Sequence, residues 1–180
     1  MTLLIHDANV LIDLIGIDLL DLALDLPFNM STTDLVHREI EDPKQARALA
    51  ACIKKRKISV IASTIQEMSA ISDCMNALPS LSLADSSVLY HAAVQKGIVI
   101  TGDGQLRKAA TARHLEVHGT PWILTQLVAT KGIDPSRAIE KMDSLLEINP
   151  RLPHKECRKL KDAWRLQLPA KAARRRERDA

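Results

Sequence analysis

A chain of 180 residues, of which 46% are hydrophobic, can bury one substantial core and suits one domain with an appendage. Its four aromatic residues are too few for a platform that stacks nucleic-acid bases, and its three cysteines, without a CxxC pair, argue against a disulfide scaffold or a thiolate zinc site. The net charge is +3. The sequence shows no pattern of a secretory leader and no apolar run near the ~20 residues of a membrane span, so we expect the protein in the cytoplasm, without membrane contact.

Short β-rich runs alternate with helical patterns along the first part of the chain. The runs that predict strands are 2–6, 28–32, 58–62, 98–101 and 115–118. The helices predicted between them follow a short first helix and cover 17–24, 46–56, 64–78, 84–96 and 104–114. Near-continuous apolar strands that alternate with helices are typical of a parallel sheet covered on both faces. We therefore expect an α/β protein with a three-layer α/β/α fold around a central parallel sheet.

After residue 119 the pattern becomes purely helical. Start and stop signals predict three C-terminal helices, over about 120–131, 134–148 and 154–167. We expect an α/β domain over 1–119 and a helical extension packed on it over 120–168. Residues 169–180 form a low-complexity basic segment, which we expect to be a loose, disordered tail.

The net charge is unevenly divided along the chain. Residues 151–180 carry 11 basic and 4 acidic side chains, a charge of +7, whereas residues 1–150 carry 14 basic and 18 acidic ones, a charge of −4. An acidic body with a basic tail suggests a polyanionic partner that one part of the protein holds and another part processes. A solvated tail without a partner is the alternative that charge alone leaves open.

Four acidic side chains are placed so that they can meet at one edge of the predicted sheet. Asp7 follows the first strand and Asp103 the fourth. Glu39 lies on a short helix after the second strand, and Asp85 in the first turn of the helix before the fourth. Parallel sheets usually open their ligand crevice at this edge, the carboxyl ends of the strands. Asp7 and Asp103 are also good N-caps, Asp85 nearly completes a capping box with Ser82, and Glu39 suits a solvated face, but capping does not require four carboxylates around one crevice.

A cluster of four carboxylates needs a countercharge, because neighbouring like charges raise one another's pKa. Mg²⁺ or Mn²⁺ suits this task, since both prefer oxygen ligands, keep several waters and accept a phosphate group into their shell. One or two such ions polarise a phosphodiester and lower the pKa of a bound water molecule. The amide of Asn9 is a candidate for orienting that water or a carboxylate, and the hydroxyl of Thr101 for the same task beside Asp103.

Four stretches in this order resemble the successive acidic motifs of PIN-domain nucleases: HDANVLIDL, the glutamate of TTDLVHREI, LADSSVLYHAAVQKG and IVITGDGQLRKAA. The resemblance spans roughly residues 3–119. It implies a parallel-sheet α/β/α fold and a Mg²⁺- or Mn²⁺-dependent endoribonuclease that hydrolyses the phosphodiester bonds of RNA. It also implies catalytic and metal-binding roles for four residues, with Asn9 and Thr101 in support. These four are Asp7, Glu39, Asp85 and Asp103.

The same resemblance suggests partners for the protein. Many bacterial PIN proteins are toxins of toxin–antitoxin pairs, so a toxin role, a small antitoxin protein as partner and a homodimer are further expectations. The domains of those toxins are usually shorter than this chain. The stretches EVHGTPWILTQLV and NPRLP resemble a longer bacterial branch with extra C-terminal helices, and this extension sets the chain apart from the toxins.

Two other functions compete with the nuclease. A haloacid-dehalogenase-like phosphatase needs a second aspartate two residues after Asp7, where the chain has Asn9. It also needs an acidic residue soon after GDG, where Leu106, Arg107 and Lys108 stand. A non-catalytic PIN-like scaffold that binds RNA or protein would predict missing carboxylates, and none is missing. Arg107 and Lys108 are themselves candidates for contacts with substrate phosphates, with a solvated helix face as the alternative.

Overall fold

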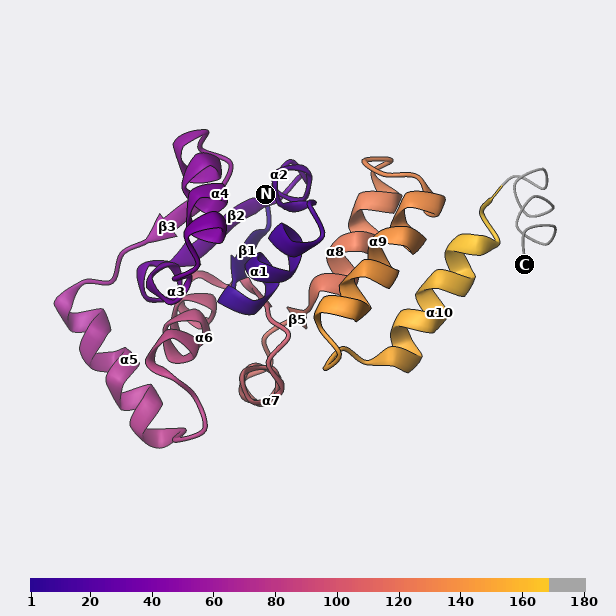
Figure 1. Cartoon of the computed structure of the whole chain (residues 1–180). Coiled ribbons are helices and arrows are strands. Elements are labelled where there is room, and N and C mark those ends of the chain that lie inside the picture. Colours follow the sequence, from indigo (N-terminus) through magenta and orange to yellow (C-terminus); the bar gives the residue numbers. More distant parts are fainter. Residues whose placement is uncertain (169–180) are drawn as a thin grey trace. The chain divides into compact units, whose positions relative to one another are not determined.

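The computed structural model describes residues 1–168 in two compact units, Met1–Thr120 and a helical unit that begins at Pro121 (Figure 1). The basic tail predicted for residues 169–180 lies outside the described residues. Each unit has its own core, and the side chains buried in both are mainly aliphatic. This agrees with the shortage of aromatic residues in the sequence.

The first unit is organised by a sheet of five parallel strands. They are β1 (Leu3–His6), β2 (Asn29–Thr33), β3 (Ser59–Ile61), β4 (Ile98–Ile100) and β5 (Val117–His118), in the order β3-β2-β1-β4-β5. The register aligns His6 with Thr32 on one side and with Ile100 on the other, so the carboxyl ends of the three central strands lie level. The predicted parallel sheet is confirmed, and the residues that follow β1 and β4 lie next to each other.

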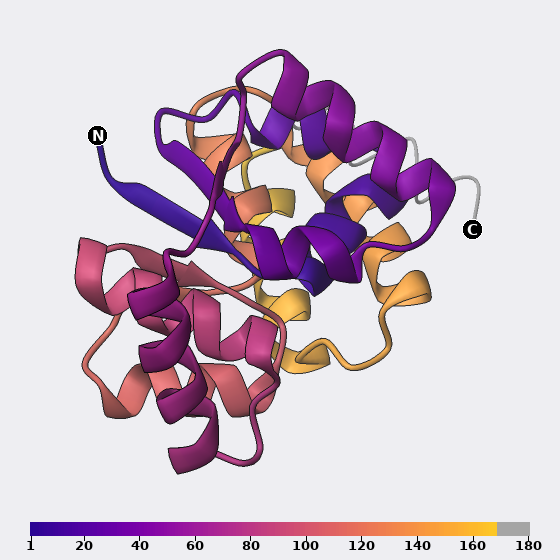
Figure 2. The same cartoon turned by 90° about the vertical axis from the view of Figure 1, so that its left-hand side faces the viewer.

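Helices cover both faces of this sheet, which confirms the three-layer α/β/α prediction (Figure 2). They are α1 (Ala8–Gly16), α2 (Leu20–Ala23), α3 (Asp34–Glu39), α4 (Pro43–Lys54), α5 (Ile65–Ala77), α6 (Leu83–Gln95) and α7 (Gly104–Ala112). Helix α6 contacts β1, β2 and β4, and Figure 2 shows the sheet between the violet helix α4 and the pink helices α6 and α7. Right-handed crossover connections produce this arrangement, because the chain moves outward from β1 to β3 and then returns to β4 and β5.

Two predicted helices differ from the structure for local reasons. The helix predicted over 46–56 begins earlier, at Pro43, because Asp42 accepts hydrogen bonds from two first-turn N–H groups at 2.9 and 3.0 Å. Proline at the first helical position has no N–H to leave unsatisfied, so it starts the helix here instead of breaking it. The helix predicted over 17–24 shortens to α2, because α1 runs on to Gly16 and is followed by a left-handed residue, Asp18, with φ 56°.

The second unit is built from the three C-terminal helices that the sequence predicts: α8 (Thr120–Ala129), α9 (Pro135–Ile148) and α10 (His154–Arg165). Helices α9 and α10 pack together, with Met142 and Leu145 buried on α9 and Cys157 and Trp164 buried on α10. None of the helices within residues 1–168 combines the length and the apolar character that spanning a bilayer requires.

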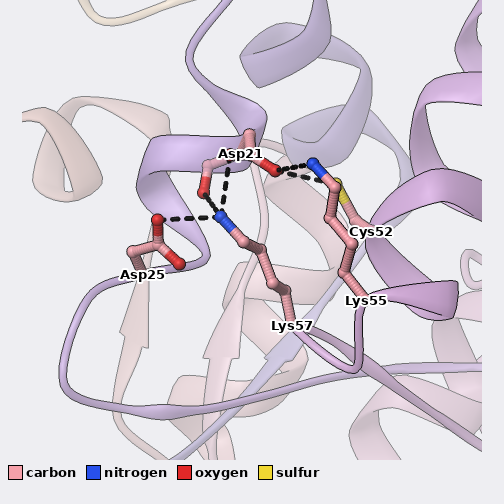
Figure 3. A network of polar contacts seen from close by, with 5 residues as sticks. All are labelled: Asp21, Asp25, Cys52, Lys55 and Lys57. Carbon is pink, nitrogen blue, oxygen red and sulfur yellow. Dashed lines mark hydrogen bonds and ion pairs between the residues drawn. The ribbon is translucent and has the colours of Figure 1, made fainter.

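A network of ion pairs connects α2 to the segment that follows α4 (Figure 3). The Nζ atom of Lys57 lies 2.7 Å from an oxygen of Asp21 and 2.8 Å from one of Asp25. The Nζ atom of Lys55 lies 3.1 Å from Asp21. Hydrogen bonds from Lys57 and Lys55 hold the pKa of Asp21 below its usual value. The acidic residues of this network therefore have their countercharge within the fold.

Candidate functional site

A pocket of about 390 Å³ opens at the carboxyl ends of the central strands. Its lining residues are Asp7, Ala8, Asn9, Ile12, Glu39, Ser82, Asp85 and Asp103. The four carboxylates among them come from the ends of β1 and β4, the last residue of α3 and the first turn of α6. The fold thus brings all four predicted carboxylates to one pocket.

Asp7 is the most deeply buried of these carboxylates, with 3% of its surface exposed. Its Oδ1 accepts a hydrogen bond from the N–H of Ala8 at 2.7 Å. Its Oδ2 accepts one from the hydroxyl of Thr101 at 2.7 Å and another from the amide of Asn9. Burial nevertheless raises the pKa of Asp7 to about 6, helped by the charges of Asp85 and Glu39 and opposed chiefly by the Thr101 hydrogen bond.

Asn9 and Thr101 join the residues after β1 to those after β4. The Oδ1 atom of Asn9 accepts a hydrogen bond from the N–H of Gly102 at 2.7 Å, while its amide nitrogen donates to Asp7. The Thr101 hydroxyl accepts one from the N–H of Asp103 at 2.9 Å. A Cβ on Gly102 would lie 3.1 Å from Oδ1 of Asn9, so the close approach favours glycine. Both side chains therefore orient carboxylates.

Asp103 and Asp85 cap helices and line the pocket at the same time. One oxygen of Asp103 accepts hydrogen bonds from the N–H groups of Gln105 and Leu106, both at 2.8 Å. One oxygen of Asp85 accepts from the N–H of Ser82 at 2.9 Å, which completes a capping box. The second oxygen of each aspartate accepts no hydrogen bond from residues 1–168. Capping and ligand binding are therefore compatible roles for these two residues.

The pocket has an excess of negative charge. Partial burial, together with the charge of Asp85, raises the pKa of Glu39. Within the described part of the chain, no lysine or arginine forms an ion pair with any of the four carboxylates. In the Asp21 network of Figure 3, by contrast, lysines neutralise the acidic side chains.

The donor set fits a hydrated Mg²⁺ or Mn²⁺. All of its charged donors are carboxylate oxygens, and Asp85 and Asp103 each keep one oxygen available to a ligand. No three acidic, histidine or cysteine side chains of residues 1–168 converge closely enough to enclose an ion. This spacing suits Mg²⁺, which proteins bind through one or two carboxylates while several waters complete the shell.

Arg107 is turned toward the protein backbone. Its guanidinium donates hydrogen bonds to the carbonyl oxygen of Thr101 at 2.8 Å and to that of Val117 at 3.3 Å. Burial lowers the pKa of this guanidinium. Arg107 thus ties the ends of β4 and β5 together and supports the loop that carries Asp103. Lys108, the other predicted phosphate contact, is exposed, and neither residue lines the pocket.

Three lining residues, Ala8, Ile12 and Ser82, have no ligand-binding role in the sequence-based prediction. Ser82 is signalled by its spacing from Asp85, which is the spacing of a capping box. Ile12 lies one turn beyond Ala8 on α1 and gives the pocket an apolar wall. No signal identifies Ile12, because an apolar residue at helical spacing is equally expected in the core.

The comparison with known proteins supports the same assignment as the geometry. A family model described as a PIN domain matches residues 3–165, which include most of the helical unit. No curated protein matches the chain significantly. The matched range covers more than half of the chain and includes all four carboxylates of the pocket. The chain therefore belongs to the PIN-domain family.

Proposed function

We propose that this protein is a Mg²⁺- or Mn²⁺-dependent endoribonuclease. PIN domains are generally nucleases. The observation that carries the proposal is the pocket itself, where four carboxylates from four separate elements meet without a cation among the described residues to balance them. Capping stabilises the individual helices, but it does not require four carboxylates around one pocket, where they repel one another. A divalent cation and a phosphate substrate account for this arrangement.

The roles of the side chains follow from their contacts. Asp7, Asp85, Asp103 and Glu39 would hold the ion, one or two of them directly and the others through its water molecules. When bound, the ion polarises the phosphodiester and lowers the pKa of a water molecule. Asn9 and Thr101 keep the Asp7 carboxylate in one orientation, and Thr101 also holds the backbone of Asp103. Glu39 is the most exposed of the four carboxylates and has no hydrogen bond to residues 1–168, so it is the one best suited to accept a proton from the attacking water.

A toxin role is the more specific form of this proposal. In it, a small antitoxin protein would block the pocket, the protein would act as a homodimer, and the RNA substrates would be cytoplasmic. Its support is membership of the PIN-domain family alone. Growth arrest on expression, abolished by Asp85→Asn, is the expected result, and normal growth with an active nuclease would exclude the toxin role.

Cleavage of labelled RNA by the purified full chain tests the nuclease. We expect cleavage with Mn²⁺, none with chelator, and none by Asp85→Asn in either condition. Asparagine preserves the size of Asp85 and its capping oxygen but removes the charge that attracts the ion. Asp42→Asn is the matched control, because Asp42 caps α4 and does not line the pocket. Cleavage by folded Asp85→Asn at the wild-type rate would reject the assignment.

A further inference from the structure

Helix α10 has one buried side and one strongly basic, exposed side. Cys157 and Trp164 are buried, and α10 packs against α9 (Figure 1). Residues three and four positions apart share one side of a helix, so Lys161 lies on that buried stripe, whereas Lys155, Arg158 and Lys159 lie away from it. Three exposed cations of α10 that form no ion pair with residues 1–168, together with Arg151 just before the helix, are called the basic face below: Arg151, Lys155, Arg158 and Lys159.

The basic face is not neutralised within the described chain. None of its four cations forms an ion pair with residues 1–168. The remaining cations of the same segment do have partners, since Lys161 pairs with Asp143 on α9 and Arg165 pairs with Asp162. The fold therefore separates the cations that stabilise it from those that remain available to a ligand.

The position of these cations is unfavourable for the isolated helix. Lys155 and Lys159 stand four residues apart, where like charges repel. Lys155 and Arg158 also lie in the first half of α10, near the positive end of the helix dipole, where Glu156 is the single acidic side chain of the first turn. The N-cap residue Pro153 contributes no side-chain hydrogen bond that would offset this effect. A bound polyanion would remove both penalties, whereas solvent alone only screens them.

We propose that the basic face of α10 binds the phosphate backbone of an RNA substrate, an inference that rests on the proposed nuclease function. The carboxylate pocket carries excess negative charge and cannot attract RNA by itself, so the enzyme needs a positively charged surface elsewhere. The basic face presents only two ammonium groups and two guanidinium groups, without an exposed tryptophan, tyrosine or phenylalanine side chain. Such a surface contacts phosphates and does not read bases, so binding should be independent of sequence.

The chain offers a closely matched control for this proposal. Lys155 and Arg158 occupy the second and fifth positions of α10, and Lys44 and Arg47 occupy the second and fifth positions of α4. All four side chains are exposed and form no ion pair with residues 1–168. The double variants Lys155→Gln/Arg158→Gln and Lys44→Gln/Arg47→Gln therefore remove the same charges from equivalent places.

The experiment measures binding of a labelled single-stranded RNA to the full chain by fluorescence anisotropy, in chelator and over a range of salt concentrations. Each lost phosphate contact should lower the slope of log K against log salt by about 0.7, hence by about 1.4 for the α10 double variant. That change corresponds to roughly 25-fold weaker binding at about 0.1 M salt if the two proteins bind equally near 1 M. The α4 double variant should retain the wild-type slope. Circular dichroism verifies that both variants remain helical.

Three results would overturn the proposal. An unchanged slope in the α10 variant, or an equal loss in both double variants, would mean that the basic face makes no specific contact with RNA. Polyglutamate serves as a model of an acidic protein. If the α10 double variant loses binding to polyglutamate but keeps its binding to RNA, the face binds an acidic protein instead. A cleavage assay with the same RNA and Mn²⁺ distinguishes failure of the RNA-binding proposal from failure of the proposed nuclease function. A wild-type chain that binds through α10 but never cuts rejects the nuclease and retains the RNA-binding face.

Discussion

The replacement of Asp7 by asparagine should change how the stability of the metal-free protein depends on pH. Burial, together with the charges of Asp85 and Glu39, raises the pKa of Asp7 in the folded chain from 3.8 to about 6. The folded state therefore holds this proton more tightly than the unfolded state does. The stability contributed by the protonated group is fully present below pH 3.8 and is lost as the pH rises through about 6. Asparagine has no proton to lose in this range.

The size of the effect follows from the two pKa values. A difference of roughly two pKa units corresponds to about 3 kcal/mol once the group is ionised in both states. About half of this loss falls above pH 5, so Asp7→Asn should gain about 1.5 kcal/mol relative to the wild type between about pH 5 and pH 8. His6 and His91, whose pKa values are lowered by burial, are present in both proteins and cancel from the comparison. Altered hydrogen bonds to Thr101 add a pH-independent offset.

Urea unfolding followed by circular dichroism, in chelator, gives the free energy of unfolding of both proteins at each pH. Saturating Mn²⁺ should then favour the wild type, because the ion binds its ionised carboxylates and stabilises the native state by mass action. A free-energy difference between the two proteins that stays constant with pH, or that moves in the opposite direction, would refute the description of Asp7 as a carboxylate held in an uncompensated cluster.

Three further variants test individual contacts of the site. Asp103→Asn should lose most of the rise in melting temperature that Mn²⁺ confers. Asp42→Asn is the control and should keep this rise, because Asp42 caps α4 with the same two types of hydrogen bond. If Mn²⁺ raises the melting temperature of both variants equally, Asp103 is a cap only. Arg107→Gln should reduce kcat for RNA cleavage and cost about 1–3 kcal/mol of stability, because its guanidinium holds two backbone carbonyl groups. A raised KM with a flatter salt dependence would instead make Arg107 a phosphate contact. Gly102→Ala should weaken Mn²⁺ binding measured by calorimetry, because the new Cβ would lie 3.1 Å from Oδ1 of Asn9 and would disturb the hydrogen bond between residues 102 and 9. An unchanged Mn²⁺ affinity would show that this hydrogen bond does not position the site.

The sheet and the convergence of the carboxylates are predictable from the sequence because both depend on local patterns and one topological rule. Buried strands read as short apolar runs, and helices between them require a parallel sheet. Asp7 and Asp103 follow strands that are neighbours in the sheet, so their proximity requires only the strand order. The spacing of Ser82 and Asp85 likewise predicts the capping box that the structure contains.

Contacts between distant residues limit what the sequence can predict. The hydrogen bond from Gly102 to Asn9 joins residues 93 positions apart, and no local pattern signals it. Arg107 follows Asp103 by one helical turn, which suggests a substrate contact, but its long side chain reaches back to the carbonyl groups of Thr101 and Val117. Helical periodicity gives the direction in which a side chain starts, and for arginine it does not fix where the guanidinium ends.

Mn²⁺ binding and RNA cleavage measured on the same samples test the central claim, that the carboxylate pocket is a metal-dependent nuclease site. Electron paramagnetic resonance gives the bound fraction of Mn²⁺, and labelled RNA gives the rate at each Mn²⁺ concentration. For the wild type, we predict that rate and occupancy rise together and that both vanish in chelator. For Asp85→Asn, both Mn²⁺ binding and cleavage should be lost over the Mn²⁺ concentrations that saturate the wild type. Cleavage that persists in chelator, or Mn²⁺ binding that Asp85→Asn leaves unchanged, would contradict the claim.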